Sequence, residues 1–557
     1  MQIRRSSSSV LALAAAIFSI PTAAHTATPK DASTADPVLT AMQQELTREQ
    51  ANLVLPGMQK PYFIEYRVDD VTSYEAVANF GALVQEQGNH QRVVRVTVRI
   101  GDYEHDSSSS RGDGTASLTA TDNNPMAIRY ALWTATDDAY KNALRAYTTK
   151  QAALQQYQTL QMQDDFAHSK PVVHSDPLVS LQIDRADWRR RIIEASGLYA
   201  ADPEVRGFAS DIQYSSANVR GMAVNRYLVN TEGTAVRNGY TAYAANISVG
   251  AQAPDGMQIS RDNGSTAVSA DALESWPAFR KRVIDDLKSI QALRAAPVVS
   301  ADDYHGPVLF SGDAASDVID RLFVPNIEAA RPEMGTTART TGQYTSSFHA
   351  RVLPEFINVT DNPLQKIFAG QQLIGAYEFD DEGTPAQPVP IVTSGKLENY
   401  LIGRTPIRDF PESNGHGRAA LGQAARPNAG VILVQSKAPL TKDTIHARLL
   451  SMARDQGRDV YEVETLGGDL APRLLYLVHP DGTRDLVRGA VFDELDHRSL
   501  RADIVAAGDD YYVNNTLGTV PQTTIAPSLL FDDIGVKRAT VEQQKLPYYP
   551  PPPTASQ

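Results

Sequence analysis

Residues 377–404 read YEFDDEGTPAQPVPIVTSGKLENYLIGR and combine an acidic turn with the pattern of a β-hairpin. The segments PVPIVT and LENYLI predict two strands, and Ser-Gly-Lys at 394–396 predicts the turn between them. Just upstream, Asp380, Asp381 and Glu382 form a second turn that ends at a glycine. Three adjacent carboxylates could hold a cation or act as acid and base in catalysis, but an acidic turn before a hairpin favours a solvated position.

Catalysis by these carboxylates would need a partner group from another part of the chain, because general acid–base chemistry uses groups that converge. The glycine-rich segment NGHGRA at 414–419 offers His416 and Arg418. In a hydrolase of this kind, Asp381 or Glu382 would be the base and His416 a proton shuttle or ligand. The simpler interpretation, which the sequence favours, places His416 in a turn where its ring bonds a local carbonyl.

Other charged residues in the same region are candidates for binding rather than catalysis. Asp380, Arg404 and Arg418 are the candidates for contacting a peptide or a partner protein. Arg404 and Arg408 could each hold a peptide carboxylate through two hydrogen bonds. Arginines at solvated strand ends would give the same sequence, so this alternative stays open.

Hydrophobic patterning on either side of this region predicts an α+β chain of two halves. In the β-rich C-terminal half, residues 304–545, a strand at 306–310 precedes a helix from Asp313. The N-terminal half, residues 38–300, is predicted as a mixed α/β domain with an antiparallel meander over 208–264. The meander has four predicted turns, at Glu232-Gly233, Asn238-Gly239, Asp255-Gly256 and Asn263-Gly264.

A long helical insertion is predicted near residues 137–167, a stretch rich in Ala, Gln and Lys without Pro or Gly. The spacing of Asp164, Asp165 and His168 would place them on one face of this helix. Two further polar residues follow, His174 and Asp176. The set could bind a metal ion, but a polar helix end, where His168 interacts with the C-terminal dipole, explains the same residues. No metal site is therefore predicted in this chain.

Composition and the N-terminal residues predict an exported protein. The 557 residues carry a formal net charge of −13, which argues against nucleic acid as a partner, and the absence of cysteine excludes disulfides and thiolate chemistry. Two arginines, an apolar run and small residues are typical of a signal peptide over 1–24, with cleavage near Ala24 or Ala27. A linker at 25–37 and a proline-rich tail at 546–557 complete the chain. We expect a periplasmic or secreted protein with no transmembrane anchor.

Several segments together resemble a known family. The region 377–404 with the following NGHGRAA, the strand–helix GPVLFSGDAASDVIDRLF at 306–323 and the segment TTIAPSLLFDDIGVKR at 523–538 are similar to the TldD/PmbA family. That family was named for modulation of DNA gyrase and contains metalloprotease-related proteins. The resemblance implies two halves of the TldD/PmbA type and a dimer that encloses a chamber for extended, unfolded peptides.

This chain lacks the residues that the resemblance implies for a zinc site. The catalytic TldD-type members carry an HExxxH motif on the helix after the GPVLF-like strand, and a cysteine completes the zinc site. Residues 311–320 contain neither histidine nor glutamate, and the chain has no HExxxH motif and no cysteine. This pattern resembles the PmbA-type (TldE) subunit. The resemblance therefore implies no cofactor in this chain, with zinc expected only in a TldD-type partner.

These observations predict the non-catalytic subunit of an exported peptidase complex that acts on unfolded peptides. The expected partner is a TldD-type HExxxH subunit in a heterodimer, or a second copy of the chain. One alternative is a peptidase or other hydrolase that uses a non-HExxxH site around Asp381 and His416. The other is a peptide-binding protein without an enzymatic role, which would capture extended chains at a strand edge.

Overall fold

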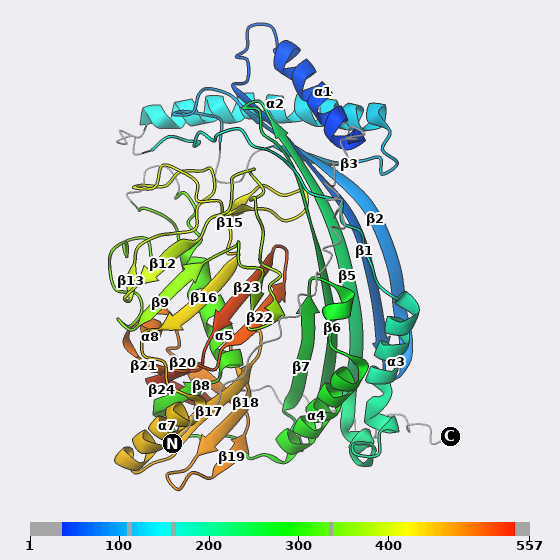
Figure 1. The fold of residues 1–557 in the computed structure, drawn as a ribbon. Helices are drawn as coiled ribbons and strands as arrows, with labels where there is room; N and C mark the ends of the chain where they lie inside the picture. Colours follow the sequence, from blue (N-terminus) through cyan, green and yellow to red (C-terminus); the bar gives the residue numbers. More distant parts are fainter. Residues whose placement is uncertain (1–35, 109–113, 157–162, 333–337, 541–557) are drawn as a thin grey trace, which may run out of the picture. The chain divides into compact units, whose positions relative to one another are not determined.

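The computed structural model describes residues 36–108, 114–156, 163–332 and 338–540, and the predicted signal peptide and proline-rich tail lie outside them. Within the described part, the strands between residues 63 and 267 form one sheet, and those between 304 and 538 form the others (Figure 1). The predicted α+β class with two halves is confirmed.

A sheet of long strands forms the N-terminal half. Its order is β3 (Thr115–Thr119), β2 (Ala82–Arg99), β1 (Phe63–Asn79), β5 (Ile212–Asn230), β6 (Ala235–Gln252) and β4 (Val173–Ser175), with β7 (Gln258–Ala267) also paired to β6. The pairs are antiparallel except β4 with β6. Side chains alternate between the two faces of β2, where Val94, Val96 and Val98 are buried.

Helices bury the apolar side chains of this sheet at two places. Near one end, α1 (Pro37–Asn52) and α2 (Pro125–Gln156) enclose a core with β1 and β2 that includes Val94 and Leu132. A second core joins α3 (Arg185–Ala201) and α4 (Trp276–Ala295) to β5, β6 and β7. Two short 3₁₀ helices are η1 (Arg206–Asp211) and η2 (Ala270–Ala272).

The C-terminal half contains two larger sheets around one shared core. The first has the order β13 (Lys396–Leu397), β12 (Val389–Thr393), β9 (Ile357–Asp361), β16 (Val431–Ser436), β23 (Pro521–Ala526) and β22 (Tyr512–Leu517). The second has the order β19 (Arg484–Val487), β18 (Pro472–Val478), β17 (Val460–Leu466), β8 (Tyr304–Phe310), β24 (Leu529–Arg538) and β20 (Ala490–Asp493), with β21 (Ile504–Ala507) on β24. Short pairs join β10 (Ile367–Phe368) to β11 (Gln371–Gln372) and β14 (Gly417–Arg418) to β15 (Arg426–Pro427).

Helix α5 (Gly312–Leu322) packs between these two sheets. It contacts β22 and β23 of one sheet and β8 and β17 of the other, and its apolar side chains belong to the shared core. Helix α7 (Lys442–Gln456) covers a smaller core built on Leu309 of β8. The remaining helices are α6 (Val324–Ile327) and α8 (His497–Ala502). No helix in the described ranges is long and apolar enough to cross a membrane.

The prediction for the long helix was wrong at both ends. Helix α2 begins at Pro125, because Asn124 caps it by accepting hydrogen bonds from the amides of Met126 and Ala127. Residues 163–168 are not helical, and the amide of Phe166 donates to the carbonyl of Tyr103 instead. The helical spacing of Asp164, Asp165 and His168 therefore does not exist.

Two of the four predicted turns are also wrong. Turns follow β5 at 231–234 and precede β7 at 253–257, as predicted, but Asn238-Gly239 and Asn263-Gly264 lie inside β6 and β7. Gly264 serves close packing, since a Cβ there would lie 2.1 Å from the side-chain oxygen of Asn246.

The predicted hairpin is present only in part. Ser394 and Gly395 adopt φ angles of 51° and 75°, which is the turn that the sequence predicts. The second strand is restricted to β13, and LENYLI is not a strand along its length. The amide of Leu401 instead donates a hydrogen bond to the carbonyl of Ile327, because Leu401 packs with α6 in the shared core.

Candidate functional site

The acidic turn at 380–383 is buried, so its interpretation as a solvated turn was wrong. Asp380 is 2% exposed and accepts hydrogen bonds from the amides of Thr384 (2.8 Å) and Gly417 (2.9 Å). Burial and the neighbouring Glu382 raise the pKa of Asp380 well above its ordinary value. Its contacts are to its own turn and to β14, which is a structural arrangement rather than a binding surface.

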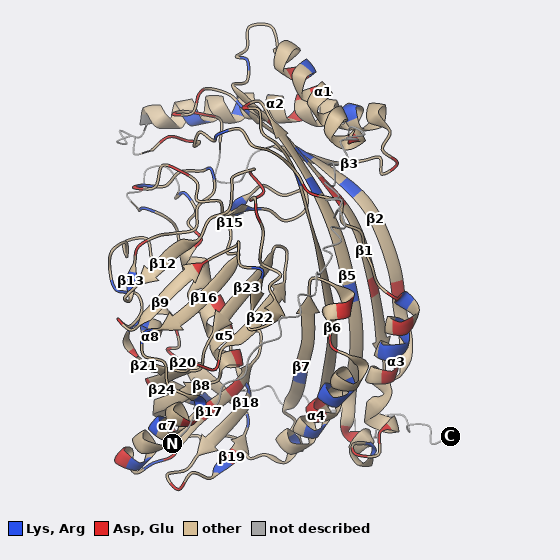
Figure 2. Cartoon of the chain, viewed as in Figure 1, with Lys and Arg blue, Asp and Glu red and all other residues tan. Residues whose placement is uncertain are grey.

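Asp381 belongs to a chain of ion pairs that reaches the N-terminal sheet. Its carboxylate lies 2.5 Å from Arg226 of β5, and Arg226 in turn lies 2.5 Å from Asp69 of β1. Burial alone would raise the pKa of Asp381, but Arg226, Arg418 and Arg67 outweigh it, and the pKa is lowered. In Figure 2, residues of both signs are interspersed along the N-terminal sheet and the loops beside it.

Glu382 and Arg404 form the second branch of this buried network. Glu382 accepts the backbone amide of Arg404 at 2.6 Å, and the Arg404 guanidinium bonds the carbonyl of Ala167 and the carboxylate of Glu232, each at 2.7 Å. Arg404 is 1% exposed and its guanidinium lies 4.0 Å from the ring centre of Phe166. A side chain with these contacts is not available to a peptide carboxylate.

Glu65 of β1 lies beside the same branch. Burial, followed by the charge of Glu382, raises the pKa of Glu65 to about 7, although Arg404, Arg67 and Arg99 act in the opposite direction. The sequence contains no signal for this carboxylate, because it appears only as one polar position in an alternating strand.

His416 is fully buried and its ring is held locally. Its Nδ1 lies 3.0 Å from the carbonyl oxygen of Asn414, as the simpler interpretation predicts, and its Nε2 lies 3.5 Å from Asp361. Asp361 accepts the amides of Gly430 and Val431. The groups that contact His416 thus differ from those that contact Asp381. Arg418, the remaining candidate, is 6% exposed and lies over the ring of Tyr377 at 4.0 Å.

Helix α5 occupies the place where the family resemblance puts the zinc motif. Ser311 caps it by accepting the amide of Ala314, and its hydroxyl donates to the carbonyl of Glu464. None of the eleven histidines of the sequence lies in α5. The helix instead carries three partly buried aspartates, Asp313, Asp317 and Asp320.

Those aspartates have environments that favour the neutral form. Burial raises the pKa of Asp313 to about 6, and burial with the charge of Asp313 raises that of Asp317 to about 7. Asp317 accepts a hydrogen bond from Asn514, and Asp320 accepts one from Thr524. Asp317 and Asp320 are thus hydrogen-bonded to β22 and β23. Helix α5 presents carboxylates but no imidazole ligands for zinc.

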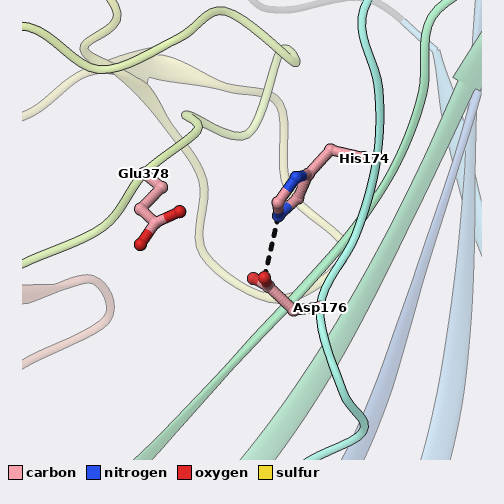
Figure 3. Close-up of side chains that lie close together, drawn as sticks. All are labelled: His174, Asp176 and Glu378. Carbon is pink, nitrogen blue, oxygen red and sulfur yellow. Dashed lines mark hydrogen bonds and ion pairs between the residues drawn. The ribbon is translucent and has the colours of Figure 1, made fainter. Parts of the chain in front are cut away.

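A separate cluster forms where β4 ends. His174, Asp176 and Glu378 each offer a ligand atom, and these atoms lie within 4.8 Å of one another (Figure 3). The other residues of the predicted helical set lie elsewhere: Asp165 pairs with Lys150 and Arg331, and His168 stacks on Tyr103. Sequence reasoning missed Glu378, which is 202 positions after Asp176 and has no spacing signal.

Comparison with known proteins identifies the family. The model of the PmbA/TldA metallopeptidase C-terminal domain matches residues 303–538. The C-terminal half of the chain belongs to the TldD/PmbA family. No curated protein is similar enough in sequence to match it.

Solved structures share the fold of this chain at low sequence identity. A protein named as a modulator of DNA gyrase from Thermotoga maritima has a TM-score of 0.60 and 15% identity, and the alignment covers 89% of this chain and 99% of that one. TldE from Thermococcus kodakarensis has a TM-score of 0.58 and 12% identity, with 89% and 99% covered. A second protein named as a modulator of DNA gyrase, from Bacteroides thetaiotaomicron, has a TM-score of 0.56 and 10% identity, with 90% and 98% covered.

Proposed function

We propose that this chain is the non-catalytic subunit of an exported TldD/PmbA-type peptidase complex that acts on unfolded peptides. The observation that carries the proposal is α5, where Ser311, Gly312 and three aspartates stand in the segment that bears HExxxH in catalytic members. Ser311 is committed to capping the helix, and a Cβ on Gly312 would lie 2.8 Å from the carbonyl oxygen of Asp510. Ser311 therefore serves the helix cap and Gly312 serves close packing.

The partner that fits this proposal is an exported TldD-type subunit with its own HExxxH motif, and self-pairing is the alternative assembly. Similarity to a protein named TldE supports this choice. The predicted signal peptide over residues 1–24 supports a periplasmic or secreted location, where the partner would also have to be found.

The buried network argues against a hydrolase site around Asp381 and His416. Asp381 is 6% exposed and His416 is fully buried, so substrate would have no access to either group. The ion pairs of Asp381 hold a carboxylate whose pKa is lowered, which is unfavourable for a general base. The charges of this turn instead join the two halves of the chain.

The mature chain alone should leave unfolded casein intact, because it lacks the HExxxH motif that would hold a catalytic zinc ion and activate its water. Adding an exported relative that carries HExxxH should give cleavage that a chelator abolishes. The measurement is the release of acid-soluble peptides over time. The control is the same relative with the first histidine of its motif replaced by alanine.

Chelator-sensitive cleavage by the chain alone would overturn the proposal. Absence of cleavage with every HExxxH relative from the same compartment, together with measurable binding of casein, would favour the peptide-binding role without enzymatic activity.

A further inference from the structure

The cluster of His174, Asp176 and Glu378, here called the His174 cluster, has the donor chemistry of a cation site. The His174 Nε2 lies 2.8 Å from a carboxylate oxygen of Asp176, and Glu378 approaches both from a segment of the C-terminal half (Figure 3). The side chains are 31%, 35% and 48% exposed, so an ion in solution can reach them. The cluster is separate from the buried network and from α5.

The backbone around the cluster is fixed by contacts that do not involve the three side chains. The amide of Asp176 donates to the carbonyl of Arg237 at 2.9 Å, and the Arg237 side chain donates back to the carbonyl of Asp176 at 2.8 Å. On the other segment, the carbonyl of Glu378 accepts the amide of Ala386 at 2.9 Å. The backbone that carries Asp176 and Glu378 is thus held in place, which reduces the entropy that binding an ion would cost.

A direct link also holds the two segments against each other. The side-chain amide of Asn238 donates to the carbonyl of Phe379 at 3.3 Å, and the His174 ring packs on the ring of Phe379 with centroids 4.7 Å apart. The approach of Glu378 to His174 therefore does not depend on attraction between their charges.

The charges around the cluster match a divalent ion. The Lys366 ammonium lies 2.6 Å from Glu378. Two carboxylates beside one imidazole are a donor set that suits a double positive charge, and Lys366 is the cation that such an ion would displace.

We propose that His174, Asp176 and Glu378 bind a divalent transition-metal ion. One imidazole nitrogen and two carboxylate oxygens suit Zn²⁺, with water completing the coordination. The ion would bridge β4 of the N-terminal half and the segment before the acidic turn. It would strengthen the junction of the halves, and the site is independent of the absent HExxxH motif and of the proposed subunit role.

Calorimetric titration of the metal-free mature chain with Zn²⁺ tests the site directly. We expect one saturable site, and at least about tenfold weaker binding in His174→Ala, which removes the imidazole, and in Glu378→Gln, which removes the negative charge of the carboxylate. Lys366→Gln should bind Zn²⁺ more tightly than the natural chain, because the competing ammonium is gone. A purely structural role for these residues would not produce that gain.

His479→Ala is the matched control. His479 also contacts two carboxylates, but Asp459 lies at its Nδ1 (2.9 Å) and Asp485 at its Nε2 (3.1 Å), so the three cannot share one ion. This variant should bind Zn²⁺ as the natural chain does. Thermal unfolding without metal shows whether each variant is folded. The proposal is overturned if the natural chain shows no saturable binding, or if His174→Ala binds as tightly while folded.

Discussion

Replacing Asp381 by alanine should lower the free energy of unfolding by about 3–5 kcal/mol, the range expected when one partner of a buried ion pair is removed. Arg226 and Arg418 would then remain buried, with side chains 6% and 7% exposed, without the carboxylate that lies between them. The amide of Ala419, which donates to Asp381 at 2.7 Å, would also lose its acceptor. The effect should be large because the charges cannot recover contact with water.

Urea unfolding monitored by circular dichroism measures this change. Asp137→Ala is the control, because its ion pair with Lys141 is exposed at 44% and 46%, and the expected loss is below about 0.5 kcal/mol. A loss within 1 kcal/mol for Asp381→Ala, on the order of an ordinary surface substitution, would mean that the network contributes little. It would also reopen the hydrolase alternative around this residue.

Replacing Glu65 by glutamine should stabilise the protein at pH 8 by roughly 2 kcal/mol and change it little at pH 5. The pKa of Glu65 is raised to about 7 from 4.5 by burial and by Glu382. A raised pKa means that the stability associated with the protonated form is complete below about pH 4.5. That stability is lost as the pH rises through 7, and glutamine, which stays neutral, avoids the loss.

The comparison requires unfolding curves at both pH values for the natural chain and for Glu65→Gln. The difference between the two proteins isolates this carboxyl group, since Asp381, with a lowered pKa, contributes in the opposite direction as the pH falls. Glu75→Gln is the control on the same strand, where the carboxylate contacts Gln87 at 3.2 Å on the surface. Equal stabilisation by Glu65→Gln at pH 5 and pH 8 would contradict the assigned pKa.

Local signals in the sequence mark the ends of helices and the positions of turns, because the chemistry that produces them is local. Helix α7 is capped by Thr441, which accepts the amide of Thr444, and ends at Gly457 with a φ of 62°. The turn at Ser394-Gly395 follows from the same kind of signal. The α+β class and the family also follow from segments that are contiguous in the chain, such as 306–323.

The failures concern residues whose partners are distant in the sequence. The sequence favours a solvated acidic turn because no local pattern identifies Arg226 as the partner of Asp381. Arg226 lies 155 positions before Asp381. Asp165 and His168 look like a helical pair, yet Tyr103 and Arg331 decide their positions. No sequence pattern connects Glu378 to His174. The two side chains meet because β4 pairs with β6 and the loop before β12 lies beside β4.

The amino-acid sequence alone therefore determined the family, the absence of a zinc motif and the capped or turned ends of individual elements. Tertiary structure decided which carboxylates are buried, which cations neutralise them and which three side chains converge at the end of β4. The physical reason is that caps and turns depend on neighbouring residues. Desolvation and Coulomb interactions depend on distances in space, and only the folded chain defines those distances.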